Sequence, residues 1–197
     1  RGKPFADAFL GYKYYWVPNE TDDKKAAEDL GYLKPVYTGE KDEQGKDIPL
    51  REGGFVLYEN TIVLPSAYVL PRGDFRFPAL NELLKPTNIY VNENKANRVA
   101  NQKALYEFLG GASYTSEDFP NWTKTKTLAQ KLHAQGVQVE VGAAKITVKA
   151  TAEKDGECLF MNFVASRGYT VTVNGKRAEL IDNDLKFLSV ALEAGEN

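Results

Sequence analysis

The chain has 197 residues, of which 43% are hydrophobic and 26% charged, the composition of a globular protein rather than a disordered one. Its 25 Lys and Arg against 27 Asp and Glu give a formal net charge of -2, so it lacks the basic field of nucleic-acid-binding proteins and we expect no nucleic-acid partner. The single cysteine, Cys158, excludes an intrachain disulfide, and no apolar run reaches the roughly 20 residues that a membrane helix needs.

The first quarter of the chain predicts one helical turn, one strand, one short helix and a polar loop. Residues 5–10 have the apolar spacing of a helical turn, and residues 12–17 form an aromatic strand that ends before a proline. Residues 21–31 begin with capping residues and end with a glycine, which indicates a surface helix. Residues 38–54 are polar and rich in turn formers, so we expect an exposed hairpin tip or loop.

The middle of the chain predicts two strands followed by two helices. Residues 55–58 and 66–70 are the strand candidates. Residues 94–109 place their apolar side chains on one broad stripe that ends at two glycines, which favours an amphipathic helix. A second, weaker helical pattern covers residues 124–135.

From residue 137 onward the pattern changes to short strands separated by turn signals. Residues 157–164 are apolar on both faces, which is typical of a central strand that is covered on each side. Residues 169–173 alternate apolar and polar side chains, as a half-buried strand does. Asn174-Gly175 then supplies two residues that accept positive φ, so we expect a type I′ hairpin there.

These patterns predict a mainly β fold, an antiparallel β-sandwich of jelly-roll-like form with one or two inserted α-helices. We expect a single domain over residues 1–197, with N-terminal strands and a helical insertion in 1–136 and sandwich strands in 137–197. Two domains that divide near residue 136 are the alternative. Because the chain lacks an initiator methionine and stops directly after a strand, we expect both ends to continue in a longer polypeptide.

Five segments follow one another in an order that resembles the YfhO family of bacterial multi-pass membrane proteins, and together they span nearly the whole chain. Members of that family usually have Trp where this chain has Tyr169, and they usually continue beyond the closing Gly-x-Asn. The segments are GYKYYWVP (11–18), VLYENTIVLPSAYVLP (56–71), NQKALYEFLGG (101–111), RGYTVTVNGKRAEL (167–180) and FLSVALEAGEN (187–197).

The resemblance implies the extracytoplasmic domain of a membrane glycosyltransferase that uses a polyprenyl-phosphate sugar and modifies lipoteichoic acid or a related envelope polymer. In that architecture the catalytic acid lies between early membrane helices, outside this chain. The domain would then sit on the outer face of the bacterial cell membrane, without a cofactor and without catalysing sugar transfer by itself. Its partners would be a cell-envelope glycopolymer, which it binds or positions, and the membrane part of the same polypeptide, which it supports.

Sugar-binding platforms combine flat aromatic rings with polar side chains that bond hydroxyl groups. On the strand over residues 12–17, Tyr14 and Trp16 face one way and Tyr15 the other, so one side is core and the other can be open. Large aromatic residues are usually buried, and this general tendency favours Trp16 as a core residue. The carbohydrate-binding candidates are Trp16, Trp122, Tyr15, Glu59 and Asn60.

Other interpretations belong to different functional classes. A stand-alone carbohydrate-binding or cell-surface module would use the same residues, whereas a glycoside hydrolase would pair Glu59 with a second acid. A structural interpretation of Glu59-Asn60 is a turn in which the side chains bond backbone groups, and we favour it over catalysis. His133 stands outside any metal-ligand pattern and Cys158 has the character of a buried hydrophobe, so we predict no metal site and no catalytic residue.

Overall fold

The computed structural model describes residues 4–20, 22, 24–25, 29, 31–77, 94–113, 122–166 and 168–197. Within these residues the chain is mainly β and its strands pair antiparallel, with helices inserted between the N-terminal and C-terminal strands, which confirms the expected fold class. None of the described helices is long and apolar enough to cross a membrane.

The chain divides into two compact units. The first comprises residues 1–63 with 120–126, and the second comprises residues 64–119 with 127–197. The change of sequence pattern at residue 136 therefore lies inside the second unit. The single domain expected for residues 1–197 stays a prediction.

A short antiparallel sheet forms the first unit, and β6 is its central strand. Strand β6 pairs with β1 on one side and with β2 and β5 on the other. Alternate residues of β6, Val56 and Tyr58, are almost completely buried and pack with Val17 and Leu33. The elements are α1 (Pro4–Phe9), β1 (Tyr14–Pro18), β2 (Leu33–Pro35), β5 (Arg51–Glu52) and β6 (Phe55–Asn60).

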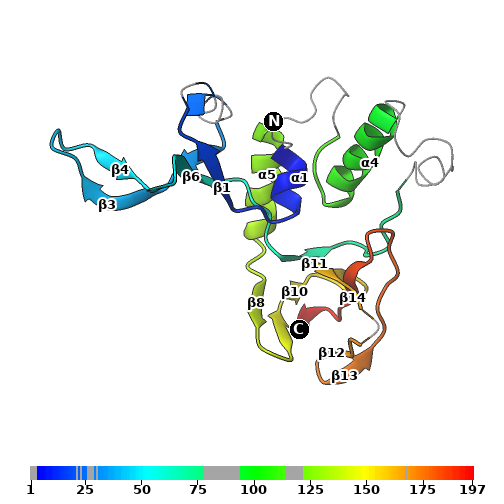
Figure 1. Ribbon diagram of the computed structural model, residues 1–197. Helices are drawn as coiled ribbons and strands as arrows, with labels where there is room; N and C mark the ends of the chain where they lie inside the picture. The colour runs from blue at the N-terminus through cyan, green and yellow to red at the C-terminus, as the bar shows by residue number, and fades with distance from the viewer. Residues whose placement is uncertain are drawn as a thin grey trace. The chain divides into compact units, whose positions relative to one another are not determined.

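The polar segment expected to be exposed is a hairpin of β3 (Tyr37–Lys41) and β4 (Asp47–Pro49), which extends away from the β1–β6 pair (Figure 1). Its turn is held by the carboxylate of Asp42, which accepts hydrogen bonds from the backbone N–H groups of Gln44 and Lys46, both at 2.9 Å. The exposed hairpin is thus confirmed. The helix expected over residues 21–31 lies mostly outside the described residues.

The second unit is built on a three-stranded sheet in the order β14-β11-β7, with β11 (Cys158–Val164) between β14 (Phe187–Ala191) and β7 (Ala67–Leu70). This confirms the prediction that β11 is a central strand. On one face, Leu159 and Met161 belong to the main buried cluster of this unit.

The opposite face of the β14-β11-β7 sheet is covered by aromatic side chains. The ring of Phe160 is fully buried and stacks on Tyr68 with 5.8 Å between centroids. Phe108, at the end of α4 (Asn94–Phe108), meets the same ring edge-on at 5.7 Å. An inserted helix therefore packs on the sheet that the sequence predicted to be buried on both sides.

Three two-stranded pairs accompany this sheet and gather around β11 and β14 in Figure 1. In the last of them, Asn174 and Gly175 have φ of 51° and 78°, as a type I′ turn requires. The first strand of this hairpin, β12, begins at Val171, two residues later than the pattern predicted, and Tyr169 before it is exposed. The pairs are β8 (Gln138–Val141) with β9 (Ile146–Lys149), β10 (Thr151–Ala152) with β15 (Gly195–Glu196), and β12 (Val171–Val173) with β13 (Lys176–Ala178).

The second predicted helix is α5 (Trp122–His133), which begins and ends two residues earlier than expected. Beyond its end, Gln135 uses its side-chain amide to cover the outer edge of β7. Its Oε1 accepts the N–H of Val69 at 2.9 Å, and its Nε2 donates to the carbonyl of the same residue at 2.8 Å. One side chain thus satisfies both backbone groups that a neighbouring strand would otherwise pair.

Candidate functional site

Strand β1 has one buried side and one open side, and its aromatic residues are divided between them. Tyr14 and Trp16 are 53% and 46% exposed, whereas Tyr15 and Val17 point the other way and are half-buried. The expectation that Trp16 is a core residue is therefore wrong. Val56 and Tyr58 form the core of this small sheet, and Val17 packs against them from its side of β1. The Trp16 side of β1 faces away from this core.

The partner strand β6 extends the open side. Residues directly opposite each other in an antiparallel pair have their side chains on the same face. Tyr14 lies opposite Glu59, Trp16 opposite Leu57, and Pro18 opposite Phe55, which is 42% exposed. We call the surface formed by Tyr14, Trp16, Phe55, Leu57 and Glu59 the aromatic face.

Polar groups gather at the Tyr14 end of the aromatic face. The amine of Lys13 is 3.7 Å from the carboxylate of Glu59 and 5.3 Å from the centroid of the Tyr14 ring. Tyr14 first, and then the Glu59 carboxylate, raise the pKa of the Lys13 amine, so it remains a cation at neutral pH. Lys34 of β2 lies opposite Glu59 on the other side of β6. Flat rings thus adjoin a carboxylate and amines that can bond hydroxyl groups.

Asn60 and Tyr15 lie outside this face. Asn60 is 2% exposed, and its amide donates to the carbonyl of Tyr12 at 3.0 Å while its Oδ1 accepts the N–H of Ile62 at 3.1 Å. These bonds give Asn60 the backbone-bonding role that the sequence favoured for the Glu59-Asn60 pair, whereas the carboxylate of Glu59 contacts the amine of Lys13 instead. Trp122 is the first residue of α5, and its side chain lies outside the described residues.

Among the described residues, the cross-strand and ionic neighbours of Glu59 are an aromatic residue and two lysines. Its neighbours across the strands are Tyr14 and Lys34, and its ionic contact is Lys13, so none of them supplies a second carboxylate. Elsewhere in the described part of the chain, no three His, Cys, Asp or Glu side chains are arranged to hold a metal ion. Cys158 is 3% exposed, and its burial raises the pKa of the thiol, which disfavours the nucleophilic thiolate.

No known protein-family profile, no curated protein and no solved structure matches this chain. Sequence reasoning missed Phe55 and Lys13 as members or neighbours of the aromatic face. The pairing register of β1 and β6 would have identified them. Side chains alternate between the two faces of a strand, and in this register Phe55 and Glu59 lie on the same face as Tyr14 and Trp16.

Proposed function

We propose that this chain is the extracytoplasmic domain of a YfhO-like membrane glycosyltransferase and that it binds a cell-envelope glycopolymer, such as lipoteichoic acid, on the aromatic face. The observation that carries the proposal is the exposure of Tyr14 and Trp16 on one side of a paired strand, with the carboxylate of Glu59 directly opposite Tyr14. Bound there, the polymer would be held as acceptor for the membrane part of the same polypeptide.

The chemistry of such a surface suits a sugar chain. Exposed aromatic rings offer flat apolar area that stacks on the C–H face of a pyranose, while nearby polar groups bond its hydroxyls. Two residues apart on a strand, Tyr14 and Trp16 are spaced by about 7 Å, so adjacent rings can contact adjacent parts of one polymer. The amines of Lys13 and Lys34 outnumber the carboxylate of Glu59, and the remaining positive charge favours an anionic polymer over a neutral one.

The segments that resemble the YfhO family include the strands of the aromatic face. Segment 11–18 contains all of β1, and segment 56–71 contains most of β6 and all of β7. Two of the five segments that carry the resemblance therefore supply the two strands of the aromatic face. A stand-alone carbohydrate-binding module would use the same face, and sequence upstream of residue 1 that encodes several membrane helices distinguishes the two.

Titration with lipoteichoic acid and with short envelope glycans tests the proposal, with binding followed by tryptophan fluorescence in the unmodified chain and by amide chemical shifts in every variant. We expect saturable binding that Trp16→Ala weakens at least about tenfold, equivalent to 1.4 kcal/mol. Tyr37→Ala is the matched control, because Tyr37 is an equally exposed aromatic residue (50%) on β3, outside the aromatic face. Equal losses in both variants, or no binding at millimolar glycan, would refute the proposal.

A further inference from the structure

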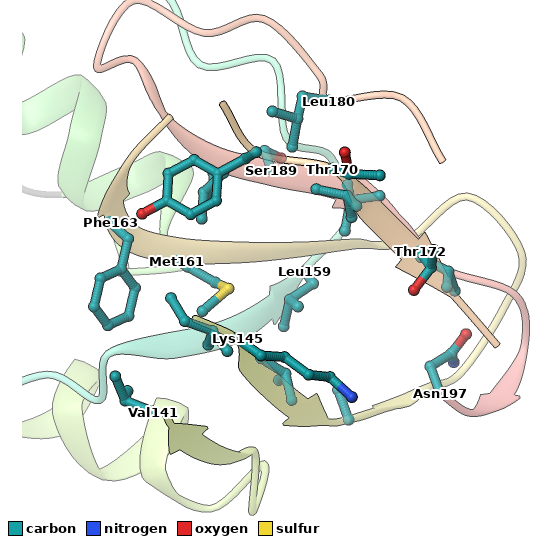
Figure 2. Close-up of a pocket in the computed structure, with 18 of the residues that line it drawn as sticks. Val141, Lys145, Leu159, Met161, Phe163, Thr170, Thr172, Leu180, Ser189 and Asn197 are labelled. Carbon is teal, nitrogen blue, oxygen red and sulfur yellow. The ribbon is translucent and has the colours of Figure 1, made fainter. Parts of the chain in front are cut away.

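The second unit contains an open cavity of about 750 Å³ among its strands (Figure 2). Leu159 and Met161 of β11 and Val190 of β14 form one wall, and the opposite walls come from the β8–β9 hairpin and from the segment that leads into β12. This volume lies within the roughly 300–1,000 Å³ that small-molecule sites occupy.

The cavity is lined mainly by apolar side chains that the hairpins leave incompletely covered. Leu159 and Met161 are 7% and 6% exposed, but Ile146, Phe163 and Val171, which pack against the same cluster, are only half-buried. Strands with this pattern normally close over their core, because apolar surface is favourably removed from water. Water against the apolar walls finds few hydrogen-bond partners there, so the apolar part of a ligand is a better occupant of that space.

Lys145 is the one charged side chain among the described residues that line the cavity. It lies in the turn between β8 and β9, and Figure 2 shows its aliphatic stem extending along the cavity. It forms no ion pair within the part of the chain that the structure describes, so its amine is available to a ligand. Thr170 and Thr172, both exposed, add hydroxyl groups to the lining. An apolar interior with one cation matches a ligand that has an apolar chain and an anionic head.

We propose that this cavity binds a single-chain anionic amphiphile of the fatty-acid class. The hydrocarbon chain occupies the space beside Leu159 and Met161, and the carboxylate pairs with the amine of Lys145. The cavity belongs to a different unit from the aromatic face, and the proposal does not depend on glycan binding.

The test uses the full chain and sodium salts of octanoate, decanoate and dodecanoate, each below its micelle concentration, with binding followed by calorimetry and amide chemical shifts. Burial of each added methylene should tighten the dissociation constant about fourfold, and the shifts should map to the residues that line the cavity. Dodecanol and dodecyltrimethylammonium should bind more weakly than dodecanoate because they lack the negative head.

Lys145→Glu should weaken dodecanoate binding at least about tenfold and should remove the preference for the anionic head over the cationic one. Lys149→Glu is the matched control, since Lys149 is an exposed lysine of β9 outside the cavity lining. The affinity of this variant for dodecanoate should equal that of the unmodified chain. Val171→Trp should fill the cavity and abolish dodecanoate binding, while the dispersion of its amide spectrum shows that the variant is still folded.

Four results would overturn the proposal. They are no saturable binding of dodecanoate, an affinity that neither chain length nor Lys145→Glu changes, retention of the protein by phosphatidylglycerol vesicles without binding of the free acid, and a dimer in sedimentation that protects the cavity residues. The last two would assign the apolar surface to a membrane or to a second copy of the chain.

Discussion

Gly73 lies where the backbone passes directly over a buried serine. A Cβ atom at this position would overlap Ser189 Oγ and would stand 3.1 Å from Ser189 Cβ and 3.3 Å from Cys158 Cβ. Ser189 is 1% exposed, and its hydroxyl has no hydrogen-bond partner among the described residues. Glycine is therefore required at this position because there is no room for a Cβ atom, and not because of the backbone conformation.

Gly73→Ala should lower the free energy of unfolding by about 2 kcal/mol, the usual size of an overpacking effect. Ser189→Ala should be neutral or slightly stabilising because it removes an unbonded buried hydroxyl, and it should reduce the cost of Gly73→Ala in the double variant. Gly168→Ala, where a Cβ meets nothing within 4 Å, is the control. Equal urea midpoints for the Gly73 and Gly168 variants would contradict the close contact.

Asp182 provides a pH-dependent contact at the surface of the second unit. Its carboxylate accepts a hydrogen bond from Lys186 at 2.7 Å and lies 3.4 Å from Arg76, and Lys186 first, then Arg76, hold the pKa of this carboxyl below the 3.8 of an unfolded aspartate. A depressed pKa in the folded state means that the contribution to stability is complete above about pH 3.8 and is lost as the pH falls through the folded value.

A carbon-detected NMR titration should therefore place the Asp182 midpoint below 3.8, and Lys186→Gln should move it upward. Because the pair is exposed, we expect little change in overall stability. A midpoint at or above the unfolded value in the unmodified chain would show that the ion pair does not persist in solution.

At the scale of elements, the β7 edge depends on one side chain from another segment. Gln135→Ala leaves both backbone groups of Val69 without their partners, so we expect a loss of about 1–3 kcal/mol in the free energy of unfolding. Hydrogen exchange of the Val69 amide should accelerate. Gln130→Ala, an exposed position on α5, should change neither quantity. Unchanged exchange at Val69 in the Gln135 variant would refute the edge contact.

Elements with a strong local signal were predictable from sequence. The apolar faces of β11 identified it as a central strand, the Asn174-Gly175 turn was recognised from its two positive-φ residues, and the glycines after α4 and α5 marked both helix ends. In each case a short stretch contains the whole physical cause. The boundaries of β1 and β12 were less accurate, because strand ends depend on the partner strand as well as on local alternation.

The open side of β1 could not be predicted in the same way. Both of its sides carry aromatic or apolar residues, and their exposure is decided by the partner strand and by which face packs on the core. General burial tendencies placed Trp16 inside, whereas Val56 and Tyr58 fill that core and leave Trp16 at the surface. The candidate site therefore required the register between β1 and β6, which is a property of distant segments.

At the scale of the whole molecule, the two units carry separate surfaces for which we propose different ligands. The first has an exposed aromatic face beside a carboxylate, and the second has an apolar cavity with one lysine. Alternation of apolar and polar residues predicted short strands in this part of the chain. The alternation could not show that the hairpins leave a cavity beside β11, because packing density depends on how strands that are far apart in sequence pack together.

The most direct test of the proposed function is an NMR titration of the chain with lipoteichoic acid in which the aromatic side-chain signals are assigned. We predict saturable shifts of the Trp16 indole and the Tyr14 ring, with smaller changes at Tyr37 on the β3–β4 hairpin. Saturable binding that leaves Trp16 and Tyr14 unchanged, or no shift at millimolar ligand, where the binding free energy is only about −4 kcal/mol, would contradict recognition by the aromatic face.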